Sequence, residues 1–296
     1  MDIVKETKLI GNYLIGLRKD FHKYPELSMQ EHRTSRKIKE ELDKINVKYK
    51  EGIRTEVVAT IGHGEGKVIA LRADMDALRI KENTGVRYQS ENEGVMHACG
   101  HDAHMASLLG AAMILKKYEN DIPGKIVLIF QPGEECSSGA RLISEHGYID
   151  EVEEIFGLHV FGDIECGKIS IEEGPRMAAS NKFTIKITGK SGHAGKPQQC
   201  IDATIVCAAI VMNLQSIISR EIDPLNSAVV TIGHIKSGET HNIISGEAFI
   251  EGTIRCFNAS TTKHIQTSIK RIAYSTAIAY GATASVEYKK NKKKKK

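Results

Sequence analysis

The segment His97-Ala98-Cys99-Gly100-His101-Asp102-Ala103-His104 carries three imidazoles, a thiol and a carboxylate, and an uncharged helical pattern, Ala106 to Leu115, follows it directly. Only a glycine separates Cys99 from His101, so a bent backbone can direct both side chains at one point. A thiolate combined with imidazole suits zinc or a similar divalent transition metal. The segment therefore predicts a metal site at the start of a helix.

The same segment has a structural alternative. A polar loop can simply cap the helix, with Asp102 as the N-cap residue and His104 exposed. Taken singly, each of these residues fits that interpretation. The concentration of so many donors in one segment favours the metal site.

Short apolar runs alternate with helical patterns in the first half of the chain. Lys125 to Phe130 is a continuous apolar run, typical of a strand buried on both faces. Val57 to Ile61 and Val68 to Ala73 are separated by a glycine-rich stretch, which predicts a hairpin. A further strand is expected at 155–160, containing His159, and helices are expected at 3–24, 34–44 and 140–146. Such alternation predicts an α/β fold with a mostly parallel sheet.

Acidic residues follow these predicted strands closely. Asp74 and Asp76 come after the strand that ends at residue 73, Glu134 and Glu135 come after the 125–130 strand, and His159 lies near the end of the next. In open α/β sheets, ligands gather beyond the carboxyl ends of the strands. We therefore expect these side chains to share one crevice with Cys99 and His101.

The second half has a different pattern. Residues 182–188 alternate between apolar and polar, as half-exposed antiparallel strands do. Further strands are expected at 228–235, 248–256 and 284–288, and helices at 203–219 and 260–280. This β-α-β-β-α-β order predicts a four-stranded antiparallel sheet with both helices on one face. The expected domains are 1–177 and 178–288, followed by a disordered lysine tail at 289–296.

Composition restricts the class of protein. The 296 residues are 41% hydrophobic and 26% charged, as in ordinary soluble globular proteins. The net charge of +4 depends on the tail, because removing its seven lysines from 41 basic residues leaves 34 against 37 acidic ones. The tail lacks the aromatic residues of a nucleic-acid platform, so we expect no nucleic-acid partner.

Cellular location is predicted from the cysteines and the apolar runs. The six cysteines have no paired spacing, which indicates reduced thiols and a cytoplasmic protein. No signal peptide is recognisable, and the uncharged run at 203–219 contains polar residues, so we interpret it as a packed helix and expect no membrane partner.

Six motifs in a fixed order give the chain a family resemblance. The chain resembles the metal-dependent amidohydrolases that include hippurate hydrolase, N-acetyldiaminopimelate deacetylase and the indole-acetyl-amino-acid hydrolases. The motifs are RADMDAL (72–78), HACGHDAH (97–104), QPGEE (131–135), GLHV (157–160), SGHAGKP (191–197) and the run from Asn242 to Arg255.

The resemblance implies a two-metal centre with Cys99, His101, Glu135 and His159 as ligands and Glu134 as general base. A divalent ion lowers the pKa of bound water to about 7, and a neighbouring free carboxylate can take its proton as it attacks an amide carbonyl. Asp76 is expected to orient a ligand imidazole. Zinc, manganese, cobalt or nickel all suit this mixed ligation.

The resemblance also assigns roles in the second domain. His193 matches a histidine that reaches the active site of a neighbouring subunit and polarises the scissile carbonyl, whereas Asn242 and Arg255 match substrate-contacting positions. It implies a homodimer formed through a lid domain, acting on small N-acyl amino acids or peptides.

Two alternatives remain open. Family members continue for about a hundred more residues, enough to complete a domain and to supply a further histidine ligand. The alternative function is therefore a truncated, catalytically inactive fragment that binds metal and dimerises. A second alternative makes Cys99 a nucleophile with His101 or His104 as its base, although such an enzyme has no need of the two glutamates or of His159.

Overall fold

The computed structural model describes residues 2–171, 173–174 and 178–288. The chain forms two compact units, Met1–Ser170 (unit 1) and Ile171–Lys296 (unit 2). The boundary predicted near residue 177 and the predicted tail at 289–296 lie outside the described residues. A catalytic role for 1–177 and a lid role for 178–288 therefore stay predictions.

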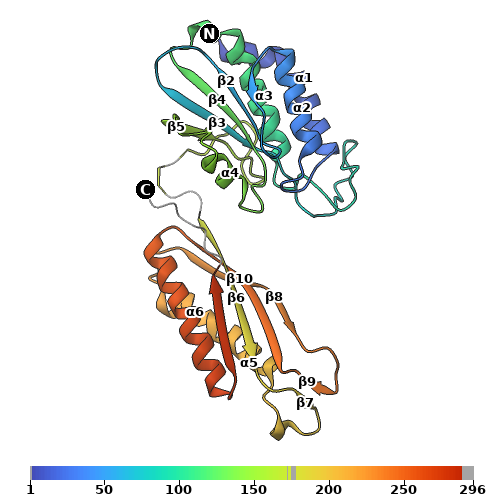
Figure 1. Cartoon of the computed structure of the whole chain (residues 1–296), viewed down its shortest axis with the longest axis vertical. Helices are drawn as coiled ribbons and strands as arrows, with labels where there is room; N and C mark the ends of the chain where they lie inside the picture. The colour runs from blue at the N-terminus through green and yellow to red at the C-terminus, as the bar shows by residue number, and fades with distance from the viewer. Residues whose placement is uncertain (1, 172, 175–177, 289–296) are drawn as a thin grey trace. The chain divides into compact units, whose positions relative to one another are not determined.

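Unit 1 is built around a five-stranded sheet of order β1-β2-β4-β3-β5 (Figure 1). The strands are β1 (Tyr49–Lys50), β2 (Val57–Ile61), β3 (Val68–Asp74), β4 (Lys125–Gln131) and β5 (Glu154–Gly157). Neighbouring pairs are parallel for β3–β4 and β3–β5 and antiparallel for β1–β2 and β2–β4, so only β2 runs against the other four. The predicted mostly parallel α/β sheet is confirmed.

The predicted hairpin of β2 and β3 is wrong. β4 lies between them, antiparallel to β2 and parallel to β3. The glycine-rich connection packs instead against the residues that precede β4: Gly66 N–H donates to the carbonyl oxygen of Pro123 (3.0 Å), and a Cβ on Gly64 would lie 2.0 Å from that oxygen. The glycines therefore permit a close backbone approach rather than a two-strand turn.

Helices cover both faces of this sheet (Figure 1). Side chains of α1, α2 and α3 pack with Val57, Ala59 and Leu128 on one face, and Ile143 of α4 packs with Val58 and Val127 on the other. The helices are α1 (Ile3–Lys23), α2 (His32–Lys44), α3 (His101–Lys117) and α4 (Gly139–Glu145), with a one-turn 3₁₀ helix η1 (Glu119–Asp121). Successive side chains of β2 point to opposite faces of the sheet, so Val57 and Ala59 enter the core with α1–α3 and Val58 enters the core with α4.

Unit 2 is a four-stranded antiparallel sheet of order β11-β6-β10-β8. Its strands are β6 (Ala179–Thr188), β8 (Ala228–Ser237), β10 (Glu247–Cys256) and β11 (Thr283–Tyr288), and its helices are α5 (Ala203–Ser216) and α6 (Ala259–Ala279). One core joins the inner residues of the sheet and of both helices, including Phe183, Ile210, Ile250 and Ile269. The predicted antiparallel sheet with two helices is confirmed.

Smaller elements complete unit 2. A two-stranded ribbon joins β7 (Gly192–His193) to β9 (Ile243–Ile244), a 3₁₀ helix η2 spans Pro197–Gln199, and α5 continues as a π-helical turn η3 (Ile217–Glu221). The stretch Ala203–Glu221 is long and apolar enough to cross a membrane by length and composition alone, a test that core helices also pass. Val206, Ile210 and Leu214 of this helix are fully buried in the unit 2 core, consistent with the packed helix expected from the sequence.

Candidate metal centre

Four segments of unit 1 meet at the carboxyl edge of its sheet. The parallel register sets Asp74, at the end of β3, opposite Gln131, at the end of β4, while Arg72 lies opposite Gly157 of β5. The loops that follow these strands supply acidic residues and His159. The segment that leads into α3 supplies Cys99, and His101 is the first residue of that helix. Three groups of side chains lie close enough to share a cation, with donor atoms within 4.8 Å of one another: Cys99, His101 and His159; Asp74, His101 and His104; and His101, Glu134 and Glu135.

His101 belongs to all three groups. It is buried, and neither of its ring nitrogens has a hydrogen-bond partner among the described residues. Carboxylate oxygens of Asp76 and Asp74 lie 3.5 and 3.6 Å from its two nitrogens, too far for good hydrogen bonds. A buried imidazole without a partner is costly unless something else binds it, and a cation at this point would satisfy the ring.

Cys99 and His159 face each other. The Cys99 Sγ atom lies 3.3 Å from His159 Nε2, and His159 Nδ1 lies 2.7 Å from the Val160 carbonyl oxygen. Since that carbonyl can only accept, Nδ1 carries the proton and the Nε2 lone pair is directed at the cluster. The sequence predicted a strand at 155–160 that contains His159. β5 instead ends at Gly157, so His159 lies in the loop that follows the strand.

The thiol of Cys99 lies among acidic groups. Burial and the nearby carboxylates of Glu135, Glu134 and Asp74 raise its pKa to about 12. This crowding of negative charge favours a bound cation, which would stabilise the thiolate and the carboxylates together. It also argues against Cys99 as a free nucleophile, because the thiolate is the reactive form.

The two adjacent glutamates come from the turn after β4. Their backbone N–H groups donate to the Asp76 carboxylate at 2.9 and 3.0 Å, so Asp76 holds this turn as well as lying near His101. Burial and the charge of Glu135 raise the pKa of Glu134, which suits a general base. Both carboxylates are near His101, and the division into Glu135 as ligand and Glu134 as base stays a prediction.

His104 has a different environment from His101. Val160 N–H donates to its Nε2 (2.9 Å), so its Nδ1 carries the proton and donates to Asp74 (2.6 Å). Both nitrogens are thus occupied in a buried side chain, contrary to the exposed His104 of the structural alternative. Asp102 is not the N-cap either: Gly100 holds that position with φ 82°, and Asp102 turns toward α1.

The candidate residues of unit 2 lie on two separate elements. His193 pairs with Ile243 in the β7–β9 ribbon, and Ala194 N–H donates to the carbonyl oxygen of Asn242 (3.1 Å), so His193 and Asn242 belong to one small substructure. Arg255 lies near the C-terminal end of β10 and contacts Thr253. Their roles toward substrate stay predictions.

The structure adds several residues that hold the site in place and that the sequence did not predict. Ser28 donates to Asp76 (2.6 Å), and buried Glu31 accepts from the Gly133 N–H of the glutamate turn (2.8 Å). His22 and Arg18 of α1 hold Asp102 at the start of α3. Nothing in one sequence marks these partners, because each contact joins positions far apart in the chain.

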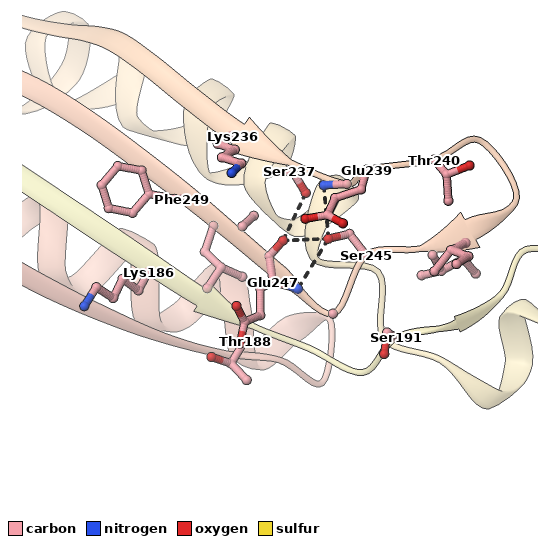
Figure 2. A pocket seen from close by; sticks show the side chains of 16 residues that line it. Lys186, Thr188, Ser191, Lys236, Ser237, Glu239, Thr240, Ser245, Glu247 and Phe249 are labelled. Atoms are coloured by element: carbon pink, nitrogen blue, oxygen red, sulfur yellow. Dashed lines mark hydrogen bonds between the residues drawn. The ribbon is translucent and has the colours of Figure 1, made fainter.

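Unit 2 also contains a hollow of about 760 Å³ beside the β8–β9 loop (Figure 2). Lysines and glutamates line it together, and Phe249 lies between Lys186 and Lys236 in the register of the sheet. The Ser245 hydroxyl already accepts from Gly238 N–H and donates to the Glu247 carbonyl oxygen. The hollow offers binding groups of both charges, whereas the cysteine, histidine and carboxylate donors gather in unit 1.

The donor set of unit 1 fits a divalent transition metal. It combines a thiol, two imidazoles with available nitrogens and two glutamates, in an interior where the acidic charge exceeds the basic charge. A carboxylate next to such a site can move protons for hydrolysis. Fold and site together define a hydrolytic metalloenzyme of the α/β class.

Comparisons with known proteins identify the family. The model of Peptidase family M20/M25/M40 matches residues 70–290, and the chain belongs to this family. The N-acetyl-L-cysteine deacetylase of Bacillus subtilis is 41% identical over 93% of this chain and 67% of that protein. The N-acyl-L-amino acid amidohydrolase of Geobacillus stearothermophilus is 41% identical over 91% of this chain and 74% of that protein.

A solved structure agrees with this assignment. The YXEP protein of Bacillus subtilis, described as a dinuclear metal binding peptidase from the M20 family, has a TM-score of 0.79 and 37% identity, covering 95% of this chain and 74% of that one. The family predicted from the sequence motifs is confirmed, and with it the class of enzyme, a hydrolase.

Proposed function

We propose that the protein hydrolyses the amide bond of N-acyl amino acids or small peptides. The observation that carries the proposal is the convergence of Cys99, His101, Glu135 and His159, with Glu134 beside them, at the strand ends of unit 1. Relatives named as deacetylases and amidohydrolases of acylated amino acids support the substrate class.

Cys99, His101, Glu135 and His159 would hold a pair of divalent cations, of zinc, manganese, cobalt or nickel. Bound cations of this kind polarise the amide carbonyl and acidify the attacking water. Glu134 then takes the proton of that water as its oxygen bonds to the carbonyl carbon. Glu134 returns the proton to the leaving nitrogen as the C–N bond breaks, which gives a carboxylic acid and a free amine.

Surrounding residues prepare these groups. Asp76 fixes the backbone of both glutamates, Asp74 and His104 form a buried pair behind His101, and the Val160 carbonyl orients His159. His193, Asn242 and Arg255 of unit 2 would bind substrate, with Arg255 pairing with a carboxylate and His193 acting on a partner subunit of a homodimer. Six unpaired cysteines support a cytoplasmic location.

Replacing Glu134 tests the proposal. Glu134→Gln keeps the shape of the side chain but removes the base, so kcat for N-acetyl amino acids should fall about a hundredfold or more while the metal content stays the same. Glu145→Gln, an exposed acid of α4, is the matched control and should change neither quantity.

An unaffected rate in Glu134→Gln would falsify the base assignment. A wild-type protein that binds metal but releases no product from a panel of N-acyl amino acids would contradict the proposed activity. That outcome would support the alternative of a metal-binding, catalytically inactive chain.

A further inference from the structure

Glu31 lies in the loop between α1 and α2 and is completely buried. One carboxylate oxygen accepts the backbone N–H groups of Met29 and Gly133, both at 2.8 Å, and the other accepts the Thr55 hydroxyl at 2.6 Å. Burial raises the pKa of Glu31, yet both oxygens accept hydrogen bonds, which is the geometry of the ionised carboxylate. Glu31 thereby ties the loop before α2 to the turn after β4.

Asp76 continues the same pattern. Its carboxylate accepts the N–H groups of Glu134 and Glu135, the two residues that follow Gly133. Three consecutive backbone N–H groups of one turn are therefore held by two buried carboxylates. Gly133 itself has φ 56°, a left-handed conformation that fixes the direction in which the chain continues.

If the proposed function holds, this turn must position two neighbouring carboxylates at the same time. Two adjacent glutamates must serve different purposes, one binding a cation and the other moving a proton, so a small rotation at Gly133 would displace both carboxylates. A displacement of about 1 Å at a reacting group can lower the rate a hundredfold. An anchor for the Gly133 N–H would therefore help to keep both carboxylates in place.

We propose that Glu31 is a positioning residue for the Glu134–Glu135 turn, acting through the Gly133 N–H and held in place by Thr55. This inference rests on the proposed function. Glu31 touches neither a predicted ligand nor substrate; its effect is to keep Glu134 where it can accept a proton.

Glu56 provides a matched control for the test. It is also completely buried, and it accepts two backbone N–H groups, Ile53 at 2.7 Å and Arg54 at 3.0 Å, and the Tyr148 hydroxyl at 3.3 Å. None of these donors belongs to the glutamate turn. Any loss of activity that comes only from disturbing a buried carboxylate should therefore appear equally in Glu56→Gln.

Three variants are compared at saturating metal. Glu31→Ala should lower kcat about tenfold to a hundredfold and change KM less than about twofold, because it displaces the base without touching substrate. Glu31→Gln should recover most of the rate, since its amide oxygen can still accept both N–H groups. Glu56→Gln should keep kcat within about twofold of the wild type. A loss of kcat in Glu56→Gln as large as that in Glu31→Ala, or a Glu31→Ala variant with the kcat of the wild type, would overturn the proposal.

A double variant separates positioning from general damage. If Glu31 acts by placing Glu134, Glu31→Ala should lower the residual rate of Glu134→Gln by a clearly smaller factor than it lowers the wild-type rate. A multiplicative loss in the double variant would contradict the proposal.

Hydrogen exchange gives a readout that needs no activity. The peptide covering residues 131–139 should exchange faster in Glu31→Ala than in Glu56→Gln, whereas equal exchange would overturn the inference. If the wild-type protein is inactive, the proposed function is contradicted. The exchange comparison then still shows whether Glu31 holds the turn.

Discussion

Individual histidines in the cluster differ in which ring nitrogens are already occupied. His104 uses both nitrogens, with Val160 and Asp74. His159 contacts the Val160 carbonyl through Nδ1 and the thiol of Cys99, itself a predicted ligand, through Nε2. Neither ring nitrogen of His101 has a hydrogen-bond partner among the described residues. These differences match a role as ligand for His101 and His159 and a supporting role for His104. The spacing of residues in the motif does not show which histidine nitrogens are free to bind a metal. From the sequence, the ligand histidines were predicted only through the family resemblance.

His22 should make stability depend on pH. The hydrogen bond to Asp102, together with that to Glu82, raises the pKa of His22 above its ordinary value of 6.5 despite burial. A raised pKa in the folded state means that this stabilisation is complete below pH 6.5 and is lost as the pH rises through the folded-state pKa. His22→Gln should therefore destabilise the end of α1 more at pH 6 than at pH 9.

Hydrogen exchange of the α1 N–H groups, corrected for its intrinsic pH dependence, measures this difference. His32→Gln, at an exposed histidine of α2, is the control and should show a smaller difference between the two pH values. An equal destabilisation by His22→Gln at both pH values would contradict the pairing with Asp102.

Among the elements, the segment from Gln131 to Gly139 depends most on close packing. A Cβ on Gly139 would lie 1.5 Å from the Pro132 carbonyl oxygen, a backbone atom that cannot move without shifting the two glutamates. Gly139→Ala should therefore cost about 1–3 kcal/mol of stability, as overpacking does. It should also weaken metal binding.

Gly11→Ala in α1 is the matched substitution. No atom of the described residues lies within 4 Å of the added Cβ, so this variant should gain about 1 kcal/mol from helix propensity and keep its metal affinity. Thermal unfolding and competition with a metal-binding dye measure both quantities. Unchanged metal affinity in Gly139→Ala would show that the turn does not position the ligands.

The elements also show how far sequence patterns extend. The apolar run of β4 correctly predicted a central strand, and the strand-end positions of Asp76, Glu134 and Glu135 correctly predicted residues that come together. The β2–β3 hairpin was wrong because local turn residues cannot reveal that a strand from much later in the chain inserts between two neighbours. Glu31 could not be found for the same reason, since its partners Thr55 and Gly133 are distant in sequence.

At the scale of the whole molecule, the chain consists of an α/β unit that holds the donor cluster and an antiparallel unit that holds His193, Asn242 and Arg255. Alternating hydrophobic patterns were sufficient to predict both folds, because each unit buries its own core. The motifs predicted the family correctly. The chain spans 67% of the Bacillus subtilis deacetylase and 74% of the solved M20 peptidase, so the activity of the intact relatives is a proposal for this protein.

The proposed metal centre requires that Cys99 binds a divalent cation together with His101, Glu135 and His159. Adding Co²⁺ to the metal-free protein tests it most directly, because a cysteine thiolate bound to cobalt produces a charge-transfer absorption in the near ultraviolet. We expect this absorption in the wild type and in Cys166→Ser, an exposed cysteine that belongs to none of the three donor groups, and its loss in Cys99→Ser. A wild-type protein without the absorption, or a Cys99→Ser variant that retains it, would show that Cys99 is not a metal ligand.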